Sequence, residues 1–231
     1  LLNKIIDKPF KGNFKYFDWE EVSIASQKVI VSRTGFTNEL GWEIYISPDN
    51  DARKIGDLLL EEGTKMGMLL TASPGFRGRR IEAGLLSAGR DFTKDRNPFS
   101  VGLGKFIDFD KGDFIGRDFL LNADKKCLTW GMRVENSFAL VDSDIVLDGK
   151  KIGIVTSSTW SPYQECGVSI VHLNDPNFGP GTIVDVLCDD GQNNKGEICK
   201  LPMYDVNGDI PRGIKVDIPK GSVPWKGINK N

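Results

Sequence analysis

The chain has 231 residues, of which 39% are hydrophobic and 27% are charged, a composition typical of a folded globular protein. Its formal net charge of −2 provides no electrostatic basis for binding nucleic acid or an acidic membrane surface. No apolar run approaches the roughly 20 residues that a membrane-spanning helix needs, so we expect neither a nucleic-acid partner nor a membrane partner.

The first segments predict a short helix followed by strands. A helix is expected to end at Pro9, and an aromatic-rich strand within residues 14–22 is expected to precede a hairpin. The hairpin strands are predicted over residues 28–32 and 42–46, joined by a short polar connection that two glycines frame.

Glu43 is the residue of this hairpin that matters most for function. Trp42 and Ile44 alternate with Glu43 and Tyr45, so one face of the second strand is apolar and the other carries a carboxylate and a phenol. The prediction places Glu43 among aromatic residues, where a charge without a partner is unfavourable. Spacing alone favours a glutamate on a solvated strand face, because charged side chains are mostly exposed.

A helix is predicted to begin at residues 47–49, where serine, proline and aspartate suit a helix start. An apolar stripe from Ile55 to Met66 is expected to face the core. Gly67 is expected to end the helix.

Residues 73–75 are predicted to break the chain before a basic segment that leads into a helix over residues 81–88. Arg77, Arg79 and Arg80 then lie near the helix start, where the helix dipole disfavours cations. A solvated basic turn accounts for them. The alternative is that at least one arginine faces an anion or a carboxylate.

The composition of the chain changes near residue 123. Before it, residues 102–104 predict a loop that enters another strand, and residues 114–121 predict a short helix. After it come short, evenly spaced strand-like runs, which are typical of a small all-β barrel. These runs are residues 128–134, 144–147, 151–156, 166–173, 182–188 and 196–200.

The predicted fold class is therefore α+β in two domains. Residues 1–122 are expected to form an α+β domain with a mixed sheet and helices, and residues 123–231 a small β-barrel domain. Asp148 and Gly149 predict a two-residue hairpin turn within the barrel. Residues 210–231 are expected to be an extended, partly ordered tail.

The four cysteines and the single histidine form no catalytic or metal-binding pattern. The cysteines, at positions 127, 166, 188 and 199, match no zinc spacing. We expect buried free thiols of a reducing compartment, and hence a cytoplasmic location. His172 lies in a strand-like run without a serine or cysteine partner motif, so a structural role is favoured. No metal site is expected.

Four blocks of sequence together resemble the glycine cleavage T-protein (aminomethyltransferase) family, which includes related folate-dependent demethylases. The blocks are RTGFTNELGWEIY at 33–45, RIEAGL at 80–85 with GRD, NP and GLG following by residue 104, KGDFIGR at 111–117, and TSSTWSP at 156–162. Their order and their span over most of the chain make the resemblance specific. It implies the T-protein folate-binding fold followed by its C-terminal barrel, with the chain corresponding to the C-terminal two-thirds of the family chain.

The resemblance implies an enzyme that transfers a methyl or methylene group from an amine or sulfonium donor to tetrahydrofolate. Glu43 is then expected to accept hydrogen bonds from the pterin, with the ring of Phe36 beside it. Arg80 is expected either to bind the ligand or to orient a carboxylate. Trp160 and Tyr163, in a loop between barrel strands, are expected to close the pocket, with ordinary interface packing as the alternative.

The implied partners are a small-molecule one-carbon donor or a lipoyl-carrier protein. The family's catalytic aspartate lies in its N-terminal half, which this chain is expected to obtain from its own N-terminal segment or from a separate chain. Asp91 and Asp113 are interpreted as loop and helix-start residues, so no catalytic residue is assigned.

One departure from the family pattern leaves the donor open. Residues 38–42 read NELGW where the T-protein usually has GEDGF, a form closer to the folate domains of dimethylglycine or sarcosine dehydrogenases and oxidases. A dimethylsulfoniopropionate demethylase-like enzyme is a further candidate. A non-catalytic folate-binding protein of the iron–sulfur repair type is disfavoured, because that signature has a cysteine where this chain has Asp113. Phe36 replaces the family's usual tyrosine, which removes a hydroxyl but keeps a ring that can stack.

Overall fold

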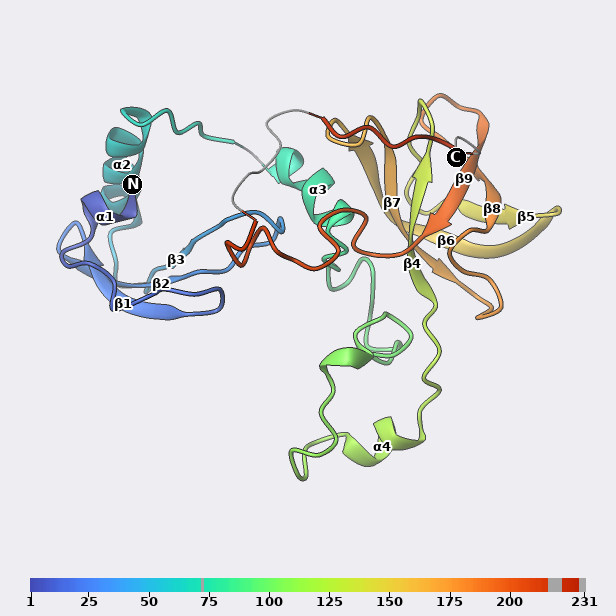
Figure 1. Cartoon of the computed structure of the whole chain (residues 1–231), viewed down its shortest axis with the longest axis horizontal. Helices are drawn as coiled ribbons and strands as arrows, with labels where there is room; N and C mark the ends of the chain where they lie inside the picture. Colours follow the sequence, from blue (N-terminus) through green and yellow to red (C-terminus); the bar gives the residue numbers. More distant parts are fainter. Residues whose placement is uncertain (72, 216–221, 229–231) are drawn as a thin grey trace. The chain divides into compact units, whose positions relative to one another are not determined.

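The computed structural model describes residues 1–71, 73–215 and 222–228 (Figure 1). The chain divides into two compact units. The N-terminal unit comprises residues 1–76 and 207–218, and the barrel unit comprises residues 77–206 and 219–231.

The N-terminal unit is built on a three-stranded antiparallel sheet in the order β1-β2-β3. Its elements are α1 (Leu2–Ile5), β1 (Trp19–Ile24), β2 (Gln27–Ser32), β3 (Glu43–Tyr45) and α2 (Ala52–Thr64). The predicted hairpin is confirmed, because β2 pairs with β3 and Ser32 lies opposite Glu43. The turn between β1 and β2 has positive φ at Ala25 (52°) and Ser26 (64°). It has no glycine or asparagine to reveal it in the sequence.

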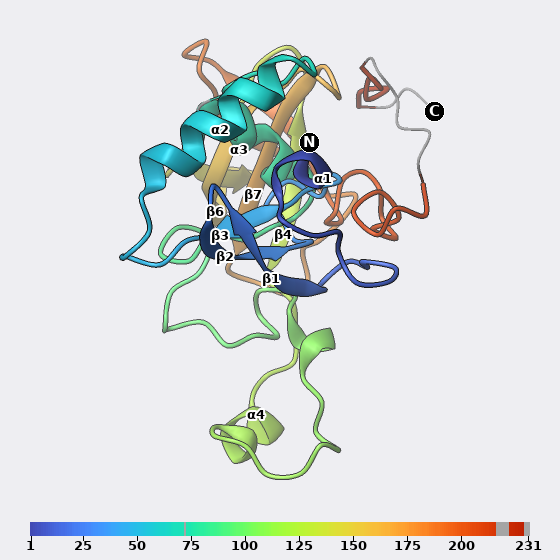
Figure 2. The same cartoon turned by 90° about the vertical axis from the view of Figure 1, so that its left-hand side faces the viewer.

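The core of this unit lies between the sheet and the two helices. Branched side chains of β1 and β2 meet Ile5 of α1 and Ile55 of α2, and Leu58 and Leu59 pack against them. Figure 2 shows the backbone of α1, α2 and the three strands. The apolar stripe of α2 therefore faces the sheet, as its helical spacing predicts.

The start of α2 differs from the prediction. The helix begins at Ala52, and the side chain of Asp51 accepts a hydrogen bond from the backbone N–H three residues later, at 3.0 Å. The predicted start at residues 47–49 is wrong, because these residues close a separate turn in which Asn50 Oδ1 accepts from the N–H of Ser47 (2.7 Å). Asp51 is thus the residue that caps the free amides.

The end of α2 also corrects one core residue. Met66 was expected in the core, yet 53% of it is exposed. The helix ends at Thr64, so Met66 no longer follows the 3.6-residue spacing of the stripe. Gly67 has φ +83°, and its N–H donates to the carbonyl of Thr64 (3.0 Å), which fits the predicted helix end.

The helix within which the two units divide begins earlier than predicted. Helix α3 spans Ser73–Glu82, so the expected helix over residues 81–88 is wrong. Proline is tolerated in a first helical turn because its missing N–H is not needed there. Arg79 and Arg80 consequently lie in the last turn, where the carbonyl end of the helix favours cations. The predicted conflict with the dipole does not arise.

Residues 93–128 form a long excursion with little regular structure (Figure 1). A short 3-10 helix, η1 (Gly104–Phe106), occupies the place where a strand was expected, and residues 93–128, all of them described, contain no named strand. Helix α4 (Arg117–Asn122) confirms the predicted short helix. It starts three residues late because Gly116, with φ +88°, is its N-cap.

Six antiparallel strands then close the barrel in the order β4-β7-β6-β5-β8-β9. They are β4 (Thr129–Val134), β5 (Asp144–Leu147), β6 (Lys150–Ser161), β7 (Cys166–Leu173), β8 (Ile183–Leu187) and β9 (Asn193–Cys199). The predicted barrel and its six strands are confirmed, and so is the turn at Asp148 (φ 49°) and Gly149 (φ 75°).

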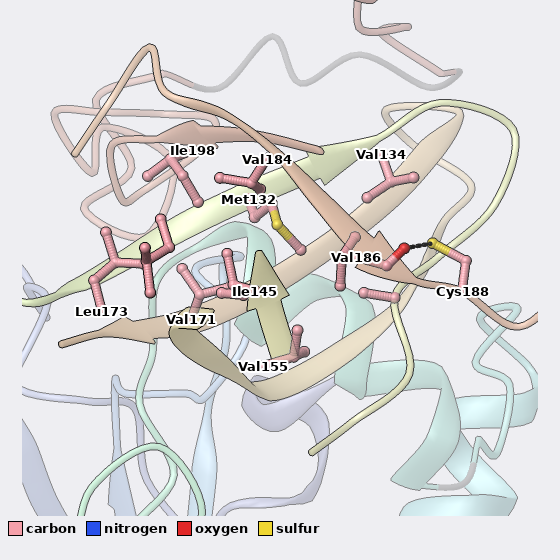
Figure 3. Close-up of a cluster of buried hydrophobic side chains, with 12 residues drawn as sticks. Met132, Val134, Ile145, Val155, Val171, Leu173, Val184, Val186, Cys188 and Ile198 are labelled. Carbon is pink, nitrogen blue, oxygen red and sulfur yellow. Dashed lines mark hydrogen bonds between the residues drawn. The ribbon is translucent and has the colours of Figure 1, made fainter. Parts of the chain in front are cut away.

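The barrel has an apolar interior and a second cluster outside it. Figure 3 shows the interior, where Met132, Ile145, Val155 and Val171 meet from four strands. Strand β7 is buried on both faces, because its alternate residues pack with Ile81 of α3 in a separate cluster. Helix α3 thus covers the outer face of β7.

The cysteines are free, as predicted, but one of them is only partly buried. All four cysteines are free thiols, and three are buried. His172 Nδ1 lies 2.9 Å from Thr129 Oγ1 in a hydrogen bond between β7 and β4. In the part of the chain that the structure describes, no group of histidine, cysteine or acidic side chains could hold a metal ion. No helix among those residues is long and apolar enough to span a bilayer.

The predicted tail lies partly outside the described residues, namely at 216–221 and 229–231. Of the described part, Val223 N donates to Tyr163 O at 2.6 Å and Trp225 N donates to Gln164 O at 2.8 Å. The domain boundary at residue 122 stays a prediction. The compact units instead divide within α3.

Candidate functional site

The residues predicted to bind the ligand are divided between the two units. Glu43 and Phe36 belong to the N-terminal unit, whereas Arg80, Trp160 and Tyr163 belong to the barrel unit. The local surroundings of each side chain indicate what it can do chemically.

Glu43 has two hydroxyl partners on the polar face of β3. Thr34 Oγ1 and the hydroxyl of Tyr45 both donate to Glu43 Oε2, the second at 3.0 Å. Among the described residues, Oε1 of Glu43 accepts no hydrogen bond. Glu43 is half-buried, and its Oε1 can accept an N–H donor from a ligand.

Apart from Tyr45, the aromatic residues near Glu43 lie on the other face of the strand. Trp42 stacks on Phe10 and Phe14, with ring centroids 5.2 and 5.1 Å away. With Ile44 these rings line an apolar groove of about 700 Å³. Of the aromatic residues expected around Glu43, Tyr45 therefore shares its face of the strand and contacts it, whereas Trp42 lies on the opposite face, because successive strand residues point to opposite faces.

Phe36 lies in the connection between β2 and β3 and is 49% exposed. An exposed ring in a turn is available for stacking on a planar ligand.

Arg80 is engaged with a buried carboxylate. Its Nη1 donates to Asp91 Oδ2 at 2.8 Å and to the carbonyl of Leu85 at 3.0 Å, and its Nη2 donates to Ser157 Oγ at 2.8 Å. The Arg80 side chain is only 12% exposed and that of Asp91 is fully buried. Of the two roles predicted for Arg80, the geometry supports the orientation of a carboxylate.

Asp91 collects further hydrogen bonds from three segments. The backbone N–H of Ser87 donates to Oδ2 (2.8 Å), while the hydroxyls of Thr156 and Ser157 lie 2.7 and 2.6 Å from Oδ1. Arg96 Nη1 donates to the backbone carbonyl of Asp91 (2.8 Å). Asp91 was interpreted as a loop residue, and it is in a loop, but its side chain ties α3 and the following turn to β6.

Trp160 is a strand residue and not a loop residue as predicted. It lies near the end of β6, paired with Gly167 of β7, and is 37% exposed. Tyr163 does lie in the loop between β6 and β7. Its ring faces the guanidinium of Arg79, with 4.6 Å from the ring centroid to Cζ. A role for either residue in closing a ligand pocket stays a prediction.

Glu82 is a buried acid that the sequence analysis did not single out. Only 1% of it is exposed. Arg79 Nη1 donates to Oε2 (2.7 Å) and the hydroxyl of Ser161 donates to Oε1. Burial raises the pKa of Glu82, while the Ser161 hydroxyl and the Arg79 charge act in the opposite direction. The motif RIEAGL at 80–85 is the signal that could have revealed this residue.

Comparisons with known proteins agree with this architecture. Residues 1–111 match the family model of the GCVT N-terminal domain, and residues 129–205 match the glycine cleavage T-protein C-terminal barrel domain. An aminomethyltransferase of Caldanaerobacter subterraneus subsp. tengcongensis is 34% identical over 193 residues, covering 81% of this chain and 51% of that protein. One of Halothermothrix orenii is 30% identical over 212 residues, covering 86% of this chain and 57% of that protein.

A solved structure is similar in fold. The glycine cleavage system aminomethyltransferase T from Bartonella henselae superposes with a TM-score of 0.72 at 22% identity, covering 86% of this chain and 55% of that one. The chain thus spans about half the length of the curated relatives it matches. With both family domains matched in order along it, the chain belongs to the glycine cleavage T-protein (aminomethyltransferase) family.

Proposed function

We propose that the chain binds tetrahydrofolate through Glu43 and forms part of a folate-dependent one-carbon transferase of the aminomethyltransferase type. The family match supports the class of reaction. The single observation that carries the site is the carboxylate of Glu43, which two hydroxyls hold at Oε2 and which accepts no hydrogen bond at Oε1 from the described residues.

The fit of a pterin to this site follows from the donor pattern of its ring. The edge of a pterin presents an amino group and an adjacent ring N–H, which form a planar two-donor fork. A carboxylate accepts such a fork much as it accepts a guanidinium. Bound tetrahydrofolate would supply nitrogen 5 as the acceptor of the one-carbon unit. Glu43 would orient the ring, and Phe36 would stack on it without the hydroxyl of the family's tyrosine.

In this proposal Arg80 is a positioning residue. Its guanidinium is nearly buried and already bound to Asp91, Leu85 and Ser157, so it holds the segment after α3 against β6. The protein's contribution to transfer is then mainly the orientation of the reactants.

The test of the site is calorimetric binding of 5-formyltetrahydrofolate to the full-length protein. Hydrogen bonds to a charged group are strong enough that we expect Glu43→Gln to weaken binding about tenfold or more. Glu21→Gln is the matched control, because Glu21 lies on β1 of the same sheet, exposed and paired with Lys28. Unchanged affinity in Glu43→Gln would show that the site is elsewhere. Failure of the wild-type protein to bind would refute the folate function itself.

We further propose an aminomethyl donor on a lipoyl-carrier protein, because the curated relatives named above are aminomethyltransferases. The NELGW sequence at 38–42 keeps the dimethylglycine, sarcosine and dimethylsulfoniopropionate donors as alternatives. Incubating the protein and tetrahydrofolate with each donor separates them by product, provided that dimethylglycine and sarcosine are supplied with an amine dehydrogenase and its electron acceptor, because forming a methylene group from an N-methyl amine removes two electrons. A methylene product with the carrier protein alone supports the proposal, whereas a methylated or methylene folate formed only from a small donor contradicts it.

A further inference from the structure

The hydroxyls around Glu43 form one directed chain of hydrogen bonds. Ser32 Oγ lies 2.5 Å from Thr34 Oγ1. A hydroxyl has one proton, and that of Thr34 points to Glu43 Oε2. The proton between Ser32 and Thr34 therefore comes from Ser32. The order is Ser32 to Thr34 to Glu43, and Tyr45 donates to the same oxygen from the other side, at 3.0 Å.

This arrangement uses both acceptor positions of one carboxylate oxygen. Each oxygen of a carboxylate offers about two lone-pair positions. Thr34 and Tyr45 occupy both lone-pair positions of Oε2. No described residue donates a hydrogen bond to Oε1. A parallel two-donor fork needs one position on each oxygen. A fork therefore cannot bind Glu43 unless one hydroxyl leaves Oε2.

The two hydroxyls differ in how easily they can leave. Thr34 is half-buried and held from behind by Ser32, which is 7% exposed. Tyr45 is 52% exposed and ends β3, so its ring can rotate into solvent without opening the sheet. Water then replaces the bond that its hydroxyl loses.

We propose that Tyr45 is a displaceable cap on Glu43, an inference that rests on the proposed function. Its hydroxyl occupies Oε2 in the free protein and leaves when the two-donor edge of a 2-amino-4-oxopyrimidine ring binds. Thr34 stays and fixes the plane of the carboxylate. Tyr45 thereby lowers the affinity for forked ligands and leaves single-donor ligands unaffected, because these bind the open Oε1.

The experiment compares 6-methylpterin with 3,6-dimethylpterin, which lacks the ring N–H, on the full-length protein by calorimetry. Removing the competing hydroxyl in Tyr45→Phe should tighten 6-methylpterin binding about 3- to 10-fold and leave 3,6-dimethylpterin unchanged. Thr34→Val should weaken 6-methylpterin binding. Tyr16→Phe, a second tyrosine of the same unit, should change neither.

A spectroscopic readout accompanies the affinities. NMR spectra are recorded on protein labelled with 13C at the phenol carbon of tyrosine, and the resonance of Tyr45 is identified as the one that Tyr45→Phe removes. This resonance should shift when 6-methylpterin binds and should not shift when 3,6-dimethylpterin binds. Weaker or unchanged 6-methylpterin binding in Tyr45→Phe would overturn the proposal while the wild-type protein still binds. If the wild-type protein binds no pterin, the proposed function fails and the cap fails with it.

Discussion

Replacing Asp91 by Asn should destabilise the barrel unit by about 3 kcal/mol, because it leaves the buried guanidinium of Arg80 without its counter-charge. The amide is nearly isosteric, so the substitution creates no cavity. Its oxygen can still accept from Arg80 and from the N–H of Ser87, while its NH2 group meets the hydroxyls of Thr156 and Ser157. What is lost is the charge, and the breaking of buried ion pairs costs about 3–5 kcal/mol.

The assay is native-state hydrogen exchange of the amides of β6 and β7, which reports the free energy of opening at the strands that Asp91 ties down. Asp144→Asn is the matched control, because its ion pair with Lys151 also reaches β6 but is about half exposed on both sides. Such surface pairs contribute about 0–1 kcal/mol. In the double variant Arg80→Gln/Asp91→Asn, the loss should be at least about 1 kcal/mol smaller than the sum of the single losses. Equal effects of Asp91→Asn and Asp144→Asn would refute the reasoning.

Two further predictions concern packing and pH. A Cβ at position 167 would lie 2.2 Å from the backbone carbonyl oxygen of Ser137, so Gly167→Ala should prevent the barrel from closing. Gly56 of α2 has open space around it, so Gly56→Ala should stabilise the protein by about 1 kcal/mol. Circular dichroism during thermal unfolding checks both substitutions, and a folded, stable Gly167→Ala would contradict the tight contact at Ser137. Burial lowers the pKa of His172 from its ordinary value of 6.5 to about 4. The unfolded chain then takes up a proton that the folded protein does not, so stability should fall as the pH decreases from 6.5 to 4. Denaturant titrations of wild-type protein and His172→Gln at several pH values should show the smaller slope in the variant, and identical slopes would exclude His172 as the cause.

The sequence alone determined the barrel and the hairpin. The β-branched residues over 28–32, the short strand-like runs of the barrel and the turn at Asp148 and Gly149 are local patterns typical of strands and hairpins. The four sequence blocks determined the family in the same way, because the comparisons match both of its domains in order. These features depend on spacing within a few residues, which a single sequence displays directly.

The tertiary structure alone decided the environment of the polar side chains. Asp91 and its partners Thr156 and Ser157 are 65 and 66 residues apart in the chain, and no local spacing predicts that they meet. The roles of Arg79 and Arg80 depended on where α3 ends, which reversed the sign of their interaction with the helix dipole. For Glu43 the sequence placed the carboxylate on the polar face of a strand. Only the fold of the connection after β2 brought Thr34 to one side of its Oε2 and left Oε1 open, because hydrogen-bond geometry is fixed by atoms that different segments contribute.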